Sequence, residues 1–252
     1  FESLLHVDQI VGEYVEHKNP TYMRVFLSRS DPALNYGMIP AVLLAKIALA
    51  KLGSLASYRG FPIYPIIGVG SLPFRGHLTP SNLTRFFQEY SGVRTVTIQS
   101  ALKYDFEVES TRALVKALNS KLLEGEPPRF SLQQIRNLES ASRKLAAGYQ
   151  TRVEKLADFV NAVAAYVPKR RERKAHIGLF GYGRELSGVR LPRAINFAAS
   201  LYSIGIPPEI LGLKALSKLT DAELDTLDNL YPHWRGDVEW AGSYLCRENL
   251  DM

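Results

Sequence analysis

Residues 64–75 read YPIIGVGSLPFR, an apolar, β-rich run that passes through glycines and ends at an arginine. Two similar runs are RVFLSRSD at residues 24–31, which ends at an aspartate, and TVTIQ at residues 95–99, which ends at a glutamine. Short apolar runs of this composition predict buried β-strands. Long stretches with a helical pattern separate most of them, which favours a parallel α/β sheet or barrel.

Two further segments bring the predicted strands to five. Phe1-Glu2 reads as the end of a strand, and residues 176–184 (HIGLFGYGR) read as another strand. In parallel sheets and barrels the carboxyl ends of the strands form the rim where ligands bind. This rim would carry two carboxylates and two arginines, namely Glu2, Asp31, Arg75 and Arg184. Such a composition is typical of a site for magnesium and phosphate.

Length and composition predict one domain over residues 1–252, because 252 residues with 46% apolar content suit a single large barrel better than two small domains. The chain opens on Phe1, and we expect an upstream portion to be missing. Cys246 is the one cysteine, so no intrachain disulfide is possible and an intracellular, cytoplasmic location is expected. No uninterrupted apolar run of about 18 residues is present, which argues against a membrane span.

The net charge of +6 raises the alternative of a basic, helical nucleic-acid-binding protein. Its densest basic run, KRRERK at residues 169–174, follows the helical pattern of residues 132–167. Cations are favoured at helix C-termini, so a solvated helix end is the preferred interpretation. No aromatic RNA-binding motif or Cys/His metal spacing supports the alternative.

The helical pattern predicts a helix-rich chain. Residues 38–52 (MIPAVLLAKIALAKL) are apolar nearly all round and predict a buried helix that Gly53 ends. Ser131 is expected to cap the longest helix, which would also suit an oligomer surface. The other helices are expected at residues 8–17, 82–90 with Ser81 as cap, 110–122, 192–204, 221–230 and 240–246.

Three rim residues have alternative interpretations. Arg75 follows a glycine-rich strand end, where it would offer a bidentate donor to a phosphate or carboxylate, or would be a surface arginine beside a tight turn. Asp31 precedes Pro32 and would be a metal ligand or a turn residue. Arg193 lies in the first turn of a predicted helix, where arginine is unfavourable unless an anion is close. His77 follows Arg75 closely and is placed on the rim.

Short motifs in order over most of the chain resemble those of phosphoenolpyruvate carboxylase, specifically its smaller archaeal-type form. Phe1-Glu2 resembles the FE of the family's first metal-binding strand, and residues 30–37 resemble its SDxxxxxG segment. Gly70–Gly76 resembles the arginine-glycine loop that closes on substrate. The remaining matches are residues 96–99 to VTEQ, Arg184 to IGSR, and residues 191–195 with 207–212 to LRAI…LPxxLG.

The resemblance implies part of a TIM-like (β/α) barrel of the phosphoenolpyruvate/pyruvate type with extra helices. It implies Mg²⁺ or Mn²⁺ bound by Glu2 and Asp31. It also implies that the phosphate and carboxylate groups of phosphoenolpyruvate contact Arg75, Arg184 and Arg193. Gln99 and Lys103 would be further substrate-binding residues on the rim.

This chain departs from the larger bacterial and plant enzymes at two places. Those enzymes have HGRGG where residues 73–77 read PFRGH here, and the lysine of their SDSxKD segment falls on Leu34. The histidine that the family uses in carboxyl transfer lies in its N-terminal half, which this chain does not contain.

The implied reaction is carbon dioxide fixation: phosphoenolpyruvate and bicarbonate give oxaloacetate and phosphate, inside a homotetramer. Residues 73–80 would form the loop that closes and keeps water out. Another Mg²⁺-dependent barrel enzyme acting on phosphoenolpyruvate or a 2-oxo acid is the first alternative, and it would show no dependence on bicarbonate.

Overall fold

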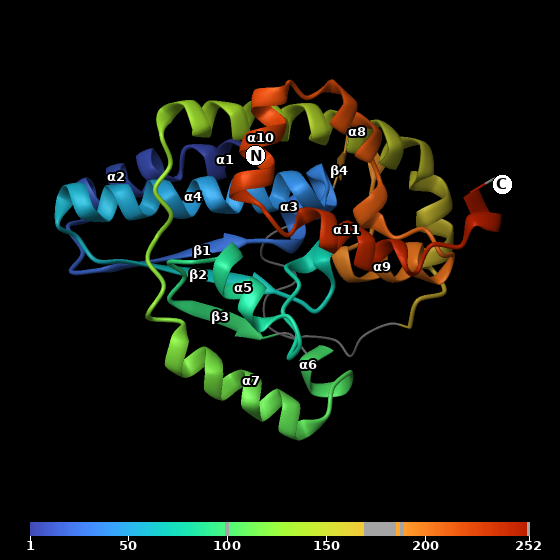
Figure 1. Cartoon of the computed structure of the whole chain (residues 1–252), viewed down its shortest axis with the longest axis horizontal. Helices are drawn as coiled ribbons and strands as arrows, with labels where there is room; N and C mark the ends of the chain where they lie inside the picture. Colours follow the sequence, from blue (N-terminus) through green and yellow to red (C-terminus); the bar gives the residue numbers. More distant parts are fainter. Residues whose placement is uncertain (99–100, 169–184, 187–188, 251–252) are drawn as a thin grey trace.

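The computed structural model describes residues 1–98, 101–168, 185–186 and 189–250. Its centre is a parallel sheet in the order β1 (Met23–Ser28), β2 (Ile63–Val69) and β3 (Thr95–Ile98). Figure 1 shows the strands side by side, with their arrowheads directed toward the helices α9 and α11. Three of the five predicted strands are therefore confirmed.

Side chains alternate between the two faces of this sheet, as the period of two in a strand requires. Leu27 and Ile67 are fully buried under helices, whereas Phe26 is 56% exposed and Tyr64 41% exposed on the opposite face. The β-branched and aromatic residues of these strands suit a pleated surface of which one side is covered.

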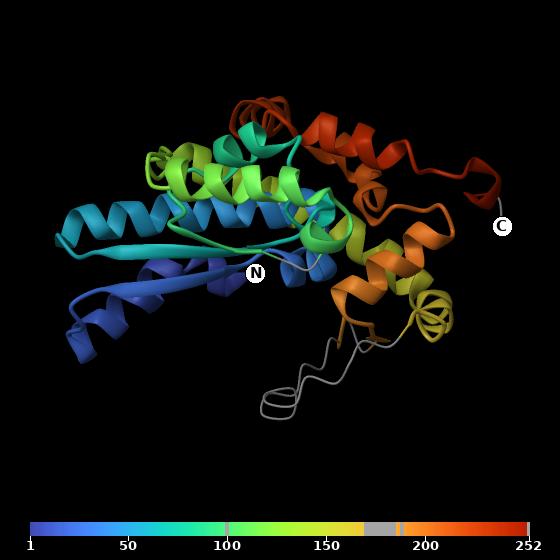
Figure 2. The same cartoon turned by 90° about the horizontal axis from the view of Figure 1, so that it is seen from below.

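Helix α4 (Met38–Arg59) lies along the strands (Figure 2) and is buried over most of its length. The prediction that Gly53 ends this helix is wrong: the helix continues to Arg59, and Gly60 at φ +60° forms its left-handed end. Gly53 serves packing instead, since a Cβ there would lie 2.4 Å from the Cβ of Pro127. Among the described residues, α4 is the helix long and apolar enough to cross a membrane, but it is mostly buried inside the protein.

Helix α8 (Leu132–Ala164) crosses α4 and contacts α9, α10 and η3 as well. Ser131 caps it as predicted: its hydroxyl accepts from the Gln134 amide, and the Gln134 side chain accepts from the Ser131 amide. At its middle, the fully buried Tyr149 donates its hydroxyl proton to the carbonyl of Leu34 at 3.0 Å. This bond ties α8 to the helix that follows β1.

The remaining elements follow the predicted order with shifted ends. Residues 221–230 are helical as predicted, whereas the helix predicted at 240–246 begins six residues earlier, at Trp234. The other α-helices are α1 (Glu2–Leu5), α2 (Val7–Lys18), α3 (Ser30–Tyr36), α5 (Leu83–Glu89), α6 (Ala101–Tyr104), α7 (Val108–Lys121), α9 (Ala194–Ser203), α10 (Asp221–Leu230) and α11 (Trp234–Gly242). Short 3₁₀ helices are η1 (Pro73–Arg75), η2 (Pro208–Ile210), η3 (Leu213–Lys218) and η4 (Arg247–Leu250), and β4 (Glu185–Leu186) pairs antiparallel with β5 (Val189–Arg190).

The predicted TIM-like barrel is wrong for the residues that the structure describes. They contain one sheet of three parallel strands and one ribbon of two short antiparallel strands. A closed barrel needs about eight strands that pair on both edges. The predicted strand end at Phe1-Glu2 is also wrong, because α1 begins at Glu2. The fifth predicted strand, at residues 176–184, lies outside the described residues.

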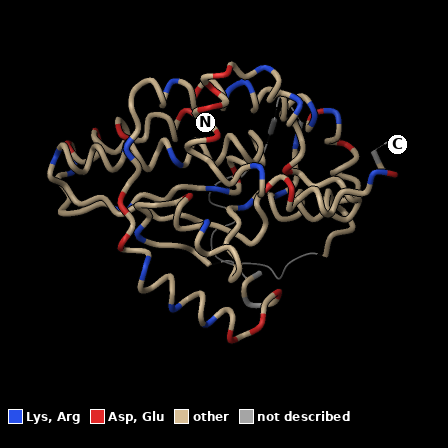
Figure 3. The backbone as a smooth tube through the Cα atoms, viewed as in Figure 1, with Lys and Arg blue, Asp and Glu red and all other residues tan. Residues whose placement is uncertain are grey.

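Basic and acidic residues are interspersed along the described backbone (Figure 3). Along α8, for example, Arg143 pairs with Glu139, and Lys144 pairs with Glu223 of α10. The basic run at residues 169–174, on which the nucleic-acid alternative depended, lies outside the described residues.

Gly212 has no room for a side chain. Its φ is +82°, and a Cβ would lie 2.6 Å from the amide nitrogen of Tyr149. We expect Gly212→Ala to lower the free energy of unfolding by about 3 kcal/mol or more, because backbone strain and overpacking add. Gly60→Ala is the matched control, since Gly60 has φ +60° and nothing within 4 Å of its Cβ position. Its expected cost is about 1 kcal/mol, and equal losses in urea unfolding would contradict the packing argument.

Glu223 at the start of α10 predicts a pH dependence. Burial opposes its charge, but hydrogen bonds from Lys144, Ser140 and the Thr220 amide outweigh burial and lower the pKa of Glu223 to about 2. A lowered pKa stabilises the fold above the unfolded value, and this stabilisation is lost as the pH falls from about 5 to about 2. We therefore expect Glu223→Gln to lower Tm at neutral pH and to differ progressively less from the parent on acidification. Glu154→Gln, at an exposed position of α8, should show no such trend.

Candidate active site at the carboxyl edge of the sheet

The carboxyl ends of β1 and β2 are neighbours, because Ser28 pairs with Gly68 across the ladder. The segment after β1 is Arg29-Ser30-Asp31, and the segment after β2 is the loop from Gly70 to Leu78. Beyond them lie α9 and α11 (Figures 1 and 2). Groups on these two segments therefore meet at one edge of the sheet, as the rim argument predicts.

The loop after β2 is closed on itself by backbone hydrogen bonds. The Gly70 amide donates to the Arg75 carbonyl at 2.7 Å, the Leu78 amide donates to the Gly70 carbonyl at 2.9 Å, and the His77 amide donates to the Leu72 carbonyl at 2.9 Å. Gly76, at φ +109°, has no room for a Cβ, which would lie 2.5 Å from Val69. Its tight bend keeps the loop against the end of β2.

Arg29 is completely buried beneath this loop. Its guanidinium donates to the carbonyls of Pro73 at 3.1 Å and Phe74 at 3.3 Å, and its Nε donates to the Tyr90 hydroxyl at 2.9 Å. Burial raises the pKa of Tyr90, and the Arg29 charge opposes that rise. A buried arginine is stable only if such acceptors replace its water.

Glu209 of η2 contacts the same loop from the other side. One carboxylate oxygen accepts from the Phe74 amide at 2.9 Å and from the Tyr202 hydroxyl at 3.0 Å. Burial raises the pKa of Glu209, and the Phe74 amide and the charge of Arg29 oppose this rise. The contact joins residues that are 135 positions apart in the sequence.

His77 ends the loop and is buried, not on the open rim as expected. Its Nδ1 lies 2.6 Å from Oδ1 of Asp237 on α11, and Tyr231 donates its hydroxyl proton to the other oxygen of Asp237. The ring of Trp240 lies against His77, with 5.5 Å between ring centroids. These contacts attach the loop to the C-terminal helices.

A buried ion pair lies behind the loop. Lys46 of α4 lies 2.8 Å from the Glu89 carboxylate on α5. Burial raises the pKa of Glu89, and Lys46 is the largest influence that lowers it again. Neighbouring His233 donates from Nε2 to the amide oxygen Oε1 of Gln88 at 2.6 Å. The interior behind the loop therefore contains polar side chains from several elements.

Two predicted site residues come together at the sheet edge. Arg75 is half-buried at the end of η1, and its Nε donates to the Ser30 hydroxyl at 3.3 Å. Asp31, also half-buried, is the neighbour of Ser30 in the first turn of α3. A guanidinium near the exit of a parallel strand suits the recognition of a small anion, and a carboxylate beside it suits the binding of a cation.

Arg193 belongs to the helix that packs against this loop. It is the exposed N-cap residue of α9, whose Phe197 stacks on Phe74 of the loop with 5.9 Å between ring centroids. Helix α9 also contacts α3, the helix that contains Ser30 and Asp31.

Glu2 lies away from Asp31 in this arrangement. Its side chain is 60% exposed and pairs with Arg143 at 3.0 Å, and the hydrogen bond from Arg143 lowers the pKa of Glu2. Phe1 packs edge-on against Tyr36 at the last turn of α3, whereas Asp31 lies in its first turn. The described residues contain no group of three or more His, Cys, Asp or Glu side chains placed to hold a metal ion. The assignment of Glu2 and Asp31 as two metal ligands therefore stays a prediction, and in this structure Glu2 pairs with Arg143.

Three predicted site positions cannot be placed. Arg184 and Gln99 lie outside the described residues, as does the side chain of Lys103 in α6. Their roles stay predictions.

Sequence reasoning missed the residues that support the loop, which are Arg29, Glu209 and Asp237. Arg29 alone had a signal, since it lies between the apolar strand and the Ser30-Asp31 motif. Glu209 and Asp237 lack one, because each acts through a contact more than 130 residues away.

Comparison with known proteins identifies the family. The family model described as phosphoenolpyruvate carboxylase matches residues 1–252. The phosphoenolpyruvate carboxylase of Metallosphaera sedula is 45% identical over 249 residues, which cover 99% of this chain and 49% of that protein. Those of Caldivirga maquilingensis and Methanospirillum hungatei are 46% and 48% identical, over 100% and 97% of this chain and 49% of each protein. The chain spans about half the length of these relatives, and it belongs to the phosphoenolpyruvate carboxylase family.

Proposed function

We propose that the full-length natural form of this chain converts phosphoenolpyruvate and bicarbonate into oxaloacetate and phosphate. The observation that carries the proposal is the family match over residues 1–252, at 45–48% identity to proteins named phosphoenolpyruvate carboxylase. Because the chain covers 49% of those proteins, the activity is proposed for the whole protein and not for this half alone.

In this proposal Arg75 binds the phosphate or carboxylate group of phosphoenolpyruvate, together with Arg184 and Arg193. Gln99 and Lys103 are further substrate-binding residues. The support within the described residues is the position of Arg75 beside Ser30 and Asp31. Phosphoryl transfer from phosphoenolpyruvate to bicarbonate gives carboxyphosphate and an enolate, and CO₂ released from carboxyphosphate then reacts with the enolate carbon. Fixed guanidinium groups would stabilise the charge of the transferring phosphoryl group.

The packing of the loop that carries Arg75 indicates whether this loop could close over the site and exclude water. Residues 73–79 are buried apart from Arg75 itself, and both ends of this stretch are hydrogen-bonded to other elements. A lid is usually drawn from weakly packed, exposed segments. We infer that this loop presents Arg75 from a fixed support, and that water exclusion falls to other parts of the protein.

A divalent cation remains a proposal. Mg²⁺ or Mn²⁺, when bound, would stabilise negative charge on the substrate oxygens. Asp31 at the sheet edge fits the chemistry of a ligand, whereas Glu2 would have to leave Arg143 to join it. The cytoplasmic location expected from the single cysteine and the homotetramer implied by the resemblance also remain proposals.

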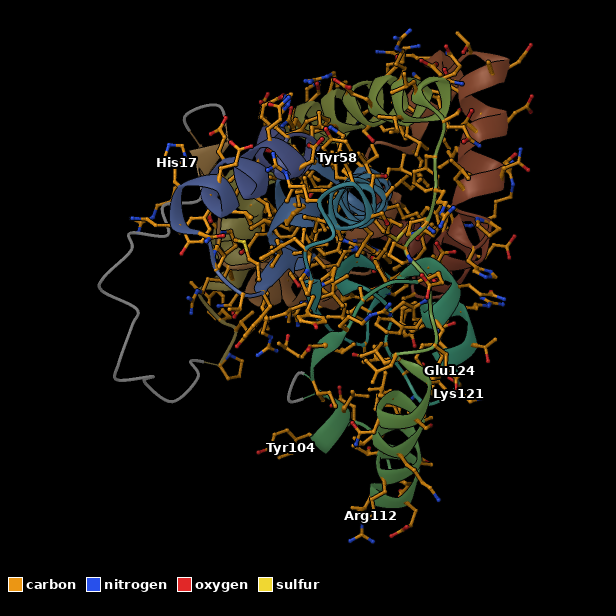
Figure 4. The ribbon with its side chains drawn as sticks, turned by 90° about the vertical axis from the view of Figure 1, so that its left-hand side faces the viewer. His17, Tyr58, Tyr104, Arg112, Lys121 and Glu124 are labelled. Atoms are coloured by element: carbon orange, nitrogen blue, oxygen red, sulfur yellow. The ribbon has the colours of Figure 1, made fainter. Side chains whose placement is uncertain are left out.

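The first test measures oxaloacetate formation from phosphoenolpyruvate with Mg²⁺, with and without bicarbonate, in the full-length form and in this chain. We expect bicarbonate-dependent product from the full-length form. Consumption of phosphoenolpyruvate without dependence on bicarbonate, and without oxaloacetate, would favour another Mg²⁺-dependent enzyme acting on phosphoenolpyruvate or a 2-oxo acid. In the same assay Arg75→Gln should lower kcat/KM for phosphoenolpyruvate about 100-fold or more. Arg112→Gln is the control: Arg112 lies at the outer end of α7 (Figure 4), pairs with Glu109, and should leave the kinetics unchanged.

Metal dependence separates the two predicted ligands. Asp31→Asn should raise the Mg²⁺ concentration for half-maximal activity by about tenfold or more, because a carboxylate ligand is lost. An equal rise in Glu2→Gln would mean that Glu2 leaves Arg143 in the working enzyme. A rise in Asp31→Asn alone would assign Glu2 to its pair with Arg143. Unchanged Mg²⁺ dependence in both variants would contradict the metal proposal for this half of the protein.

A further inference from the structure

Two buried side chains of opposite charge form hydrogen bonds with the backbone of the short helix η1. Arg29 is 0% exposed and donates to the carbonyls of Pro73 and Phe74. Glu209 is 2% exposed and accepts from the amide of Phe74. The backbone around Phe74 is therefore bound on its carbonyl side by a cation and on its amide side by an anion.

Among the described residues, neither Arg29 nor Glu209 forms a salt bridge with a side chain of opposite charge. The hydrogen bonds of Arg29 go to neutral acceptors, namely Tyr90 and backbone carbonyls. The second carboxylate oxygen of Glu209 is buried without a hydrogen-bond partner. Burying such charges costs free energy of desolvation, and apolar side chains of similar size often stabilise a fold as well or better. We therefore attribute the arrangement to a role in fixing the position of η1 and not to a contribution to the stability of the fold.

The geometry that it controls is that of Arg75. Arg75 is the residue after Phe74, its carbonyl accepts from the Gly70 amide, and its Nε donates to Ser30 at the end of β1. Its side chain extends from the backbone that Arg29 and Glu209 hold. A small rotation of η1 would move the guanidinium away from the sheet edge, and a displacement of about 1 Å can cost about 100-fold in rate.

We propose that Arg29 and Glu209 are positioning residues, which hold η1 so that Arg75 is directed to the carboxyl edge of the sheet beside Ser30 and Asp31. The proposal rests on the proposed function, because its readout is catalysis with phosphoenolpyruvate. It assigns to η2, more than 130 residues further along the chain, a part in forming the substrate site.

The test compares Glu209→Leu with Glu209→Gln in the full-length protein. Leucine has a similar volume but accepts no hydrogen bond, so the Phe74 amide is left unpaired, whereas glutamine can still accept from it. We expect kcat/KM for phosphoenolpyruvate, per folded enzyme, to fall about 30-fold in Glu209→Leu. In Glu209→Gln it should stay within about threefold of the parent. Arg29→Lys, which cannot reach Tyr90 and both carbonyls at once, should fall with Glu209→Leu.

The control is Glu223→Leu, which removes another buried carboxylate of the C-terminal helices. Glu223 bonds to Lys144, Ser140 and Thr220, and none of these partners belongs to η1. It should lower Tm without changing kcat/KM of the folded fraction.

If Glu209→Leu lowers Tm alone, as Glu223→Leu does, the positioning role is overturned. If Glu209→Gln loses as much kcat/KM as Glu209→Leu, the hydrogen-bond mechanism is overturned. If Glu209→Leu does not fold, Glu209→Gln and Arg29→Lys decide: parental kcat/KM in Arg29→Lys overturns the proposal. An inactive parent enzyme would instead overturn the proposed function itself.

Discussion

The burial of α4 on all sides from Met38 to Ala50 is the constraint from which the rest of the structure follows. The helix is apolar nearly all round, so its free energy is lowest when other elements cover every face. Its first half, including Leu43 and Ile47, packs with α8 and the C-terminal helices, and its second half, including Ala48 and Leu52, packs with the sheet. Two hydrophobic clusters therefore meet along one helix, which fixes the sheet relative to the C-terminal part of the chain.

The candidate site lies where these two clusters meet. Phe74 belongs to the cluster of α8 and α9, and Leu78, four residues later, belongs to the cluster of the sheet. The loop between them cannot bury its backbone without partners for its amides and carbonyls. Arg29, Glu209 and Asp237 supply partners for the loop from three different elements, so packing of the core and shape of the site are set together.

Local signals predicted much of this chain. The β-rich runs at residues 24–31, 64–75 and 95–99 each contain a strand, and the Ser131 cap has the expected hydrogen bond, because propensity and capping act within a few residues. The prediction that Gly53 ends α4 was wrong, because the packing of Gly53 against Pro127 cannot be inferred from the neighbouring sequence. The rim argument brought Arg75 and Asp31 to one edge, but it missed Arg29, since an arginine is normally expected at the surface. The prediction that Glu2 ends a strand was wrong, because it depended on two residues, which alone cannot form a strand ladder.

The sequence separation of the contacts that hold η1 has a consequence for synthesis on the ribosome. Arg29 precedes the loop, but Glu209 follows Phe74 by 135 residues and Asp237 follows His77 by 160. At a translation rate of about 5–20 residues per second, these later partners appear on the order of ten seconds after the loop. During that interval the nascent loop is bound on one side only. A chain terminated before Asp237 would therefore contain the three strands and the loop without all the contacts that hold the loop in place.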